Sequence, residues 1–245
     1  MKVIDCYWEL QNLGQPTVEV QVERDDVFSK RKICETVEGY GYAVVKVPMD
    51  MVAFNFGLTE MGFTCIETQM NMSISYQDFD FSKVKEISAH TAFEVIDSED
   101  GLQSVVANIT PGMFSTDRIS LDSYFGHGVG CRRYVNWITT EFRKATSQLI
   151  QILYDGVPVG FMLIKFHEDE VGLLLNGLYK PYQGHGLGML TPASPMLYIQ
   201  KSKNDGIKVE HTSISSNNIP VVKLYNRLNF EISSQSYVFV RHISK

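Results

Sequence analysis

The chain has 245 residues, of which 44% are hydrophobic and 20% are charged, and its formal net charge is −6. This composition excludes a disordered or collagen-like chain, and the length is enough for one large domain or two small ones. The acidic balance argues against nucleic acid as a partner, because gripping a duplex requires a broad basic face.

Targeting, membrane and metal signals are absent from the sequence. Residues 1–5 lack the apolar stretch of a signal peptide, and no window approaches the ~18 apolar residues of a membrane span. We therefore expect a cytoplasmic protein with no membrane contact. The four cysteines form no C-x-x-C pair, so we expect no zinc ribbon, no disulfide framework and no metal site.

The first half of the chain alternates strand-like and helix-like runs. Three predicted strands, residues 17–22, 42–47 and 66–74, carry alternating or β-branched apolar residues. A helix over 50–61 is predicted before the third strand and ends at Gly62. Residues 75–123 are polar and irregular, so we expect a connector there with one short helix over 82–87.

The second half begins with apolar residues at helical spacing, which predict a helix over 134–146. The predicted strands that follow are residues 147–154, 157–166, 171–178, 209–215 and 232–240. A glycine-rich turn over 180–188 leads from the third of these strands into an apolar helix over 189–198. A further helix over 221–228 precedes the last strand.

The turn carries the sequence Gln183-Gly184-His185-Gly186-Leu187-Gly188. A turn of this kind exposes backbone N–H groups at a helix N-terminus, where the helix dipole favours an anion, and glycine allows close approach to a phosphate. The spacing fits neither a Walker loop nor a dinucleotide-binding fold. We interpret the turn as a phosphate cradle; the alternative is a tight strand-to-helix connection without a ligand.

Two motifs in this order resemble the GNAT superfamily of N-acetyltransferases. They are Gln183-x-x-Gly186-x-Gly188 after a strand, and Asn218-x-x-x-x-x-Leu224-Tyr225-x-x-x-Asn229-Phe230. The resemblance covers roughly residues 134–242 and implies an α/β (α+β) fold, with a mixed, mostly antiparallel sheet flanked by helices. Asn229 replaces the usual glycine, and asparagine tolerates the left-handed conformation. Pro192 and Pro195 are expected to kink or shorten the helix after the turn.

The resemblance also implies a cofactor and site residues. It implies that acetyl-CoA binds as co-substrate, with its pyrophosphate on the turn and its pantetheine along the strand that ends at Leu178. The residues implied to bind the coenzyme are Leu178, Gln183, Gly184, His185, Gly186, Leu187, Gly188, Asn218 and Tyr225. Tyr225 is implied to be the catalytic residue, a general acid for the leaving thiolate.

A faint internal repeat links the two halves. Residues 58–69 resemble residues 225–235, so we interpret the front half as a smaller, truncated GNAT-like copy. We predict an N-terminal domain over 1–115 and an acetyl-CoA-binding domain over 116–245. The front copy has Leu58 where the rear copy has Tyr225 and lacks a glycine turn, so its expected role is structural.

This arrangement resembles the TDP-fucosamine N-acetyltransferase branch, which implies a nucleotide-linked amino sugar for surface polysaccharide as acceptor. The candidate substrate-binding residues are Asp117, Arg118, Tyr124 and Asn176. Arg118, Arg132 and Arg133 could meet a substrate diphosphate as bidentate donors. The strand before the turn carries no acid. The candidate bases are Asp117, Asp122, His127 and Glu168.

Several alternatives stay open from the sequence. A protein amine could replace the small-molecule amine as acceptor. The chain could instead bind acyl-CoA or a sugar nucleotide without catalysis, because the strand carboxylate is missing. The glycine turn could hold some other phosphate ligand. The expected partners are a small-molecule amine and, for oligomerisation, a second copy of the chain as a homodimer.

Overall fold

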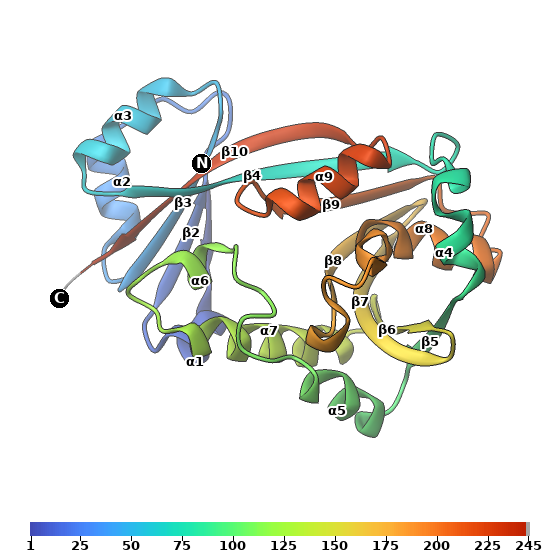
Figure 1. Ribbon diagram of the computed structural model, residues 1–245. Helices are drawn as coiled ribbons and strands as arrows, with labels where there is room; N and C mark the ends of the chain where they lie inside the picture. The colour runs from blue at the N-terminus through green and yellow to red at the C-terminus, as the bar shows by residue number, and fades with distance from the viewer. Residues whose placement is uncertain (244–245) are drawn as a thin grey trace.

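The computed structural model describes residues 1–243, and its centre is one ten-stranded sheet (Figure 1). The strands are β1 (Lys2–Asp5), β2 (Thr17–Gln21), β3 (Tyr42–Pro48), β4 (Thr64–Ser75), β5 (Thr91–Ile96), β6 (Ser147–Tyr154), β7 (Val157–His167), β8 (Glu170–Leu178), β9 (Val209–Ser215) and β10 (Glu231–His242). Their order in the sheet is β1-β2-β3-β10-β4-β9-β8-β7-β6-β5. Only the pairs β2/β3 and β8/β9 of these are parallel. The predicted mixed, mostly antiparallel sheet is confirmed.

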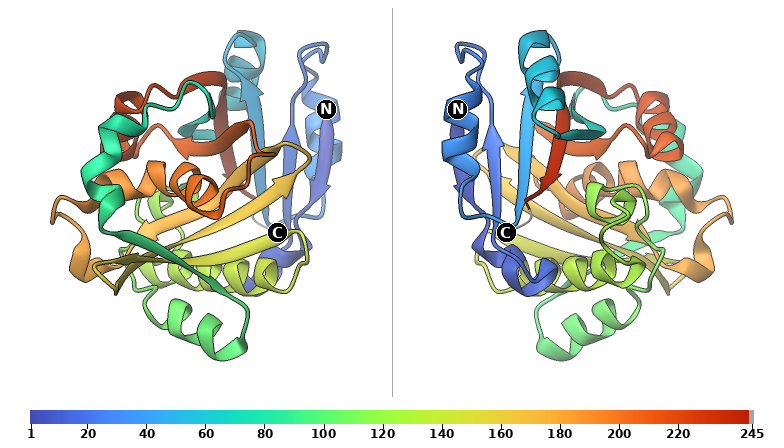
Figure 2. Two further views of the ribbon diagram at one scale, coloured as in Figure 1. Left: turned by 90° about the vertical axis from the view of Figure 1, so that its right-hand side faces the viewer. Right: turned by 90° about the vertical axis from the view of Figure 1, so that its left-hand side faces the viewer.

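Helices cover both faces of this sheet (Figure 2). The longer ones are α2 (Lys30–Val37), α3 (Val52–Glu60), α5 (Glu99–Ala107), α7 (His127–Phe142), α8 (Leu190–Ser202) and α9 (Ile219–Arg227). The shorter ones are α1 (Leu10–Leu13), α4 (Lys85–Ala89), α6 (Arg118–Leu121) and the 3-10 turns η1 (Tyr7–Glu9), η2 (Phe81–Val84), η3 (Lys180–Tyr182) and η4 (Leu187–Met189). Apolar clusters place α2, α3, α8 and α9 on one face, called here the α8 face. The same criterion places α5, α6 and α7 on the other, the α7 face.

The sheet contains the same unit twice, with the last strand of each unit exchanged. The order β2-α2-β3-α3-β4 is repeated as β8-α8-β9-α9-β10. In the first unit β3 pairs with β10, and in the second unit β9 pairs with β4. Strands β4 and β10 also pair with each other, side by side across the middle of Figure 1. The sheet is therefore continuous through both halves, and the division at residues 115 and 116 stays a prediction.

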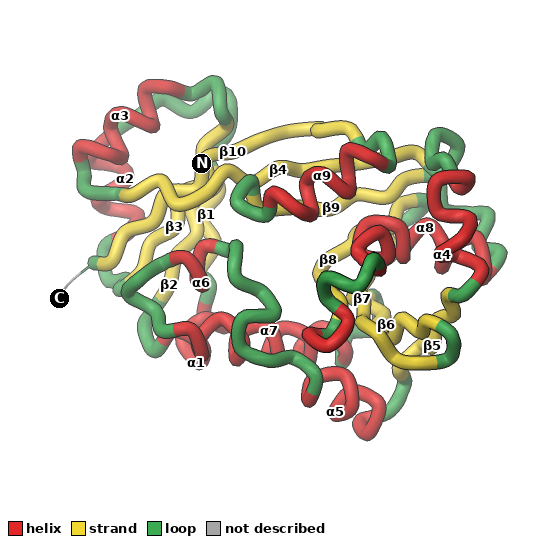
Figure 3. Tube along the Cα trace, in the orientation of Figure 1, coloured by secondary structure: helices red, strands yellow, loops and turns green. Residues whose placement is uncertain are grey.

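The segment 75–123 is more ordered than the sequence predicted, because it contains β5 and α5. Strand β5 completes one edge of the sheet by pairing with β6. Helix α5 begins at Ser98, whose hydroxyl accepts a hydrogen bond from the Gly101 N–H, and Leu102 and Val105 are fully buried. Between α5 and α7 the chain is mostly loop, with α6 within it (Figure 3).

Helix α7 begins at His127, one to two turns before the predicted start at residue 134. Gly128 and Gly130 weaken the local helix signal, because glycine has a low helix propensity. Gly130 is required by packing, since a Cβ there would lie 2.7 Å from the Ser120 Oγ atom. Tertiary contact with the α6 segment therefore overrides the local preference.

Helix α8 continues past both prolines. Pro192 and Pro195 have no N–H for the carbonyls of Gly188 and Thr191, four residues earlier. The Thr191 hydroxyl donates to the Gly188 carbonyl at 2.8 Å, and the Asn176 amide donates to the Thr191 carbonyl. Side chains thus replace the two missing hydrogen bonds, and the helix is not shortened there.

Within residues 1–243, no helix combines the length and the apolar character needed to cross a membrane.

Candidate functional site

Strands β8 and β9 begin as a parallel pair and then diverge. Their pairing runs from Glu170 and Val209 to Leu173 and Thr212 and ends there. Just beyond, Leu174 has no partner on β7, because the β7–β8 register shifts between Leu173 and Leu175. A bulge of this kind bends a strand away from its neighbour. A groove of about 1200 Å³ occupies this part of the molecule, and both diverging strands line it.

Three residues of the glycine turn, Gln183, Gly184 and Gly188, line this groove, whereas His185, Gly186 and Leu187 are outside its lining. Gly184 and Gly186 have φ values of +80° and +83°, a left-handed conformation that glycine adopts without strain. In the described part of the chain, the backbone N–H groups of Gly184, His185 and Gly186 donate to no protein acceptor. His185 is exposed. The turn therefore presents unpaired amide donors at the start of η4 and α8, the chemistry that an anion requires.

The remaining residues of the motif shape the turn and its approach to the strand. The Gln183 side-chain amide donates to the Leu178 carbonyl at 3.0 Å, which ties the turn to the end of β8. Leu178 itself is buried. A Cβ on Gly188 would lie 3.4 Å from Leu224 of α9, which is ordinary van der Waals contact, so Gly188 packs beside α9. Leu187 lies between these glycines in η4.

Tyr225 is a residue of α9. Its side chain packs in the core on the α8 face and also lines the groove. Its side chain is 2% exposed. Burial raises the pKa of the phenol well above its usual value; the nearby Glu210 carboxyl raises it further, whereas a hydrogen bond with Thr212 lowers it. The phenol is therefore neutral at physiological pH and available as a hydrogen-bond donor.

Asn218 is the residue before α9 and lines the groove beside Tyr225. Its carbonyl accepts from the Val222 N–H at 3.0 Å, as an N-cap carbonyl does. Its side chain makes no capping hydrogen bond with the helix. The carboxamide is therefore free to contact a ligand in the cleft between β8 and β9.

On the α7 face the groove is polar and strongly charged. Asp117 and Arg118 both line it. The Asp117 carboxylate accepts from the N–H groups of Ile119 and Ser120 and so caps α6. Burial lowers the pKa of Arg118, but Tyr42 and the carboxylates of Glu19, Glu9 and Glu67 outweigh it and raise that pKa overall.

Two of the three arginines expected to meet a diphosphate are engaged with the protein itself. The Arg133 Nε atom donates to Glu9 at 2.7 Å, and Arg132 donates to the Asn12 carbonyl at 2.7 Å. Arg118 lies 4.0 Å from Glu9. Glu9 is 1% exposed, so the contacts of Arg132 and Arg133 fasten η1 and α1 to α7. Arg118 lies beyond hydrogen-bond distance of Glu9, and its buried Nε atom has no partner among the described residues, so its guanidinium is the one of the three that stays free in the groove lining.

Other predicted residues lie away from the diverging strands. Tyr124 is exposed and stacks on His242 with ring centroids 4.0 Å apart, outside the groove lining. Asp122 pairs with the same histidine at 2.8 Å. Glu168 is in the β7–β8 turn with φ of +53°. Asn176 lines the groove, but its amide nitrogen is held by α8. The side chain of His127 is outside the described part.

Among the carboxylates near the cleft that sequence reasoning missed are Glu67 and Glu210. Glu67 on β4 lines the groove on the α7 face, and Glu210 on β9 is fully buried on the α8 face. The signal for Glu210 was present, because it shares the alternation of Thr212 and Ile214 that marks the inward face of a strand. Glu67 offered no such signal, because the strands next to it in the sheet, β10 and β9, belong to the second unit and pair with β4 only through the strand exchange.

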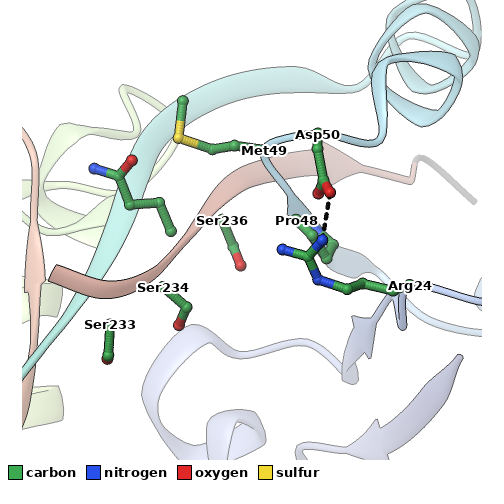
Figure 4. A pocket seen from close by; sticks show the side chains of 8 residues that line it. Arg24, Pro48, Met49, Asp50, Ser233, Ser234 and Ser236 are labelled. Atoms are coloured by element: carbon green, nitrogen blue, oxygen red, sulfur yellow. Dashed lines mark hydrogen bonds and ion pairs between the residues drawn. The ribbon is translucent and has the colours of Figure 1, made fainter.

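The first unit has a smaller pocket at the corresponding place, where β3 leads into α3. It has a volume of about 360 Å³ and is lined by Pro48, Met49 and the serines of β10 (Figure 4). An ion pair of 2.5 Å between Arg24 and Asp50 crosses it. Leu58 replaces the tyrosine here, and a Cβ on Gly57 would lie 2.0 Å from the Phe28 ring. The front unit therefore holds side chains where the rear unit has its open cleft.

No family model and no curated protein matches the sequence. Solved structures share the fold at low sequence identity. A functionally unknown conserved protein from Staphylococcus epidermidis has a TM-score of 0.61 and 12% identity, over 94% of this chain and 84% of that chain. A GCN5-related N-acetyltransferase from Kribbella flavida has a TM-score of 0.57 and 14% identity, over 94% and 82%. A tandem GNAT protein from the clavulanic acid biosynthesis pathway has a TM-score of 0.57 and 13% identity, over 95% and 77%. The chain thus has a GNAT fold in a two-half arrangement, as the sequence predicted.

Proposed function

We propose that the chain is an acetyl-CoA-dependent N-acetyltransferase that acts on a small primary amine. The observation that supports this most strongly is the glycine turn, which has unpaired amides and whose residues Gln183, Gly184 and Gly188 line the groove between β8 and β9. The main chains of two diverging strands leave polar groups there that an extended pantetheine arm could satisfy. The residues lining this cleft therefore fit the coenzyme.

In this proposal the chain's own groups divide the work. The amides of Gly184 to Gly188 bind the pyrophosphate, and Asn218 and the end of β8 orient the pantetheine. The bound coenzyme supplies an activated thioester. Tyr225 donates a hydrogen bond to the sulfur, which stabilises the leaving thiolate. Because burial raises the pKa of Tyr225, full proton transfer to a thiolate near pKa ~8.5 is favourable only if the same dry site also raises the thiol's pKa.

The finer substrate proposal is a nucleotide-linked amino sugar, handled in the cytoplasm. It rests on the sequence resemblance to the TDP-fucosamine branch and on a groove large enough for more than an amine. The engagement of Arg132 and Arg133 with the protein weakens the expected contact with a diphosphate. A protein N-terminus is the alternative acceptor within the same reaction class.

Isothermal titration tests the coenzyme half of this proposal directly. Acetyl-CoA is expected to bind with micromolar affinity, and acetyl-pantetheine, which lacks the pyrophosphate, is expected to bind at least about 100-fold more weakly. Equal affinities would contradict the proposal that the glycine turn binds the pyrophosphate. Absence of acetyl-CoA binding would contradict the proposed function as a whole.

A second candidate is a module that binds acyl-CoA without catalysis. Two observations favour it: residues 171–178 of β8 carry no carboxylate, and the raised pKa of Tyr225 makes it a weak acid. Thiol release from acetyl-CoA in the presence of amines separates the two candidates. A chain that binds acetyl-CoA tightly but never releases thiol with any amine is a binding module.

A further inference from the structure

The α7 face of the groove holds more carboxylates than permanent cations. The carboxylates are Glu9, Glu19, Glu67, Asp117 and Glu170, and the cations are Lys46, Arg118 and Arg133. Glu9 is 2.7 Å from Arg133, Glu19 is 3.1 Å from Lys46, and Asp117 caps α6. Glu170 and His211 lie 3.6 Å from each other at the closed end of the β8–β9 pair. Within residues 1–243, neither Glu67 nor Asp117 has a cation within 4.0 Å, and Asp117 is occupied as the cap of α6, so Glu67 is the carboxylate with neither a cation nor a capping role.

Glu67 lies at the open end of the cleft. Its carboxyl is close enough to the side chain of Ser215, the last residue of β9, for that hydroxyl to lower its pKa, and Ser215 lies beyond the point at which β8 and β9 separate. The next residues are fastened to the same stretch of β4. The Ser216 N–H donates to the Thr68 carbonyl at 2.8 Å, and the Asn217 amide donates to the Ile66 carbonyl at 3.2 Å. The carboxyl is therefore held next to the segment that leads to Asn218.

We propose that Glu67 binds the ammonium group of the acceptor and takes one of its protons. The acceptor class is then a primary amine that is cationic at neutral pH. This inference rests on the proposed function. The bound ammonium would supply the cation that Glu67 lacks among the chain's own side chains.

The surroundings of Glu67 also suit a proton acceptor. Burial raises the pKa of Glu67 and Asp117 raises it further, whereas Ser215, Arg118 and Lys46 lower it, and the net direction is upward. Burial acts on an ammonium in the opposite direction and lowers its pKa. Both shifts reduce the difference between the pKa of the ammonium and the pKa of Glu67, so the proton transfer becomes less unfavourable.

The reaction balances as follows. Glu67 takes one proton from the ammonium and leaves a neutral amine. The nitrogen lone pair forms the C–N bond to the acyl carbon, and the C–S bond breaks with its electron pair on sulfur. A second proton leaves the nitrogen, and sulfur gains one, through Tyr225 or directly. The products are the N-acetyl amide, CoA thiol and a protonated Glu67, which returns its proton to solvent.

The test compares Glu67→Gln and Glu67→Asp with wild type and with Glu94→Gln, a control at an exposed carboxylate on the edge strand β5. Each protein is titrated with acetyl-CoA. Each is then titrated, with and without CoA, with glucosamine, a dTDP-linked 4-amino sugar and a lysine-free hexapeptide, each compared with its N-acetylated form. All three compounds carry an ammonium group, and comparing them distinguishes a free amino sugar, a nucleotide-linked amino sugar and a peptide N-terminus as its source.

We expect wild type to bind at least one amine more tightly than its acetylated form, and Glu67→Gln to lose about tenfold or more of that preference. Acetyl-CoA affinity should stay unchanged. With the preferred amine, kcat/KM of Glu67→Gln should fall about 100-fold and lose its acidic limb, with Glu67→Asp in between. The proposal is overturned if wild type prefers no amine under either condition, or if Glu67→Gln behaves as the control does. Failure of wild type to bind acetyl-CoA refutes the proposed function instead, and the titrations without CoA still decide the role of Glu67.

Discussion

The carboxyl of Glu210 lies close enough to Tyr225 to raise the pKa of its phenol. Glu210 stands between Ile74 of β4 and Val171 of β8 in the sheet, and both neighbours are apolar. It is 0% exposed, and neither carboxyl oxygen has a hydrogen-bond partner among the described residues. Burial raises the pKa of Glu210 well above its usual value. The fold thus favours the neutral form of both groups.

Replacing Glu210 with leucine should flatten the dependence of stability on pH. As pH rises above about 4.3, the unfolded chain loses this proton first while the folded chain keeps it, so folding stability falls. The slope reaches about 1.4 kcal/mol per pH unit between the two pKa values. In urea unfolding at pH 5, 6, 7 and 8, the advantage of Glu210→Leu over wild type should therefore grow with pH. A constant difference would mean that Glu210 is ionised in the folded chain.

Tyr225→Phe should lower thiol release about 100-fold while leaving acetyl-CoA affinity within a few-fold. The phenol is lost but the ring remains, and the Thr212 hydroxyl keeps its own bond to the Leu173 carbonyl at 3.0 Å. Because burial raises the pKa of Tyr225, the wild-type rate should show no basic limb from this group below about pH 10. Unchanged turnover in the variant would assign the leaving-group proton to another donor.

Gly186→Ala should abolish acetyl-CoA binding at a modest loss of stability. Alanine in a left-handed conformation is strained by about 1–2 kcal/mol, so the turn is expected to leave the conformation that keeps its amides unpaired and accessible. Gly156 in the β6–β7 turn is a matched control, with φ of +77° against +83° and no atom within 4 Å of a Cβ at either position. Calorimetry should show similar stability losses for both variants, and titration should show a binding loss for Gly186→Ala alone. Equal acetyl-CoA affinities of the two variants would mean that the turn does not bind the coenzyme.

Arg133→Met should destabilise the fold by about 3–5 kcal/mol, because it leaves the Glu9 carboxylate buried without its closest cation. Arg31→Met is the control, since its pair with Glu35 is exposed and contributes about 0.5 kcal/mol or less. Urea unfolding at pH 7 compares the two. A small loss for Arg133→Met would show that Arg118, 4.0 Å from Glu9, replaces it.

Local patterns predicted the rear unit well, and distant contacts explain most of the rest. The glycine turn and the helix bearing Tyr225 are each specified within a short stretch, so their motifs could be recognised. The partner of Arg133 is Glu9, more than a hundred residues earlier, and no local pattern connects them. In the same way, Pro195 was expected to disturb α8, but the backbone hydrogen bond that it cannot make is replaced by one from the Asn176 side chain of β8.

The exchange of β4 and β10 has a consequence for how the chain reaches its final state. Neither unit can complete its part of the sheet until the last strand of the other unit has paired with it. The last step of folding therefore joins segments from opposite ends of residues 1–243. Topologies of this kind fold slowly. Until then β3 and β4 have open edges, which other chains can pair with. Dilution and low temperature during renaturation should therefore improve the yield of native material.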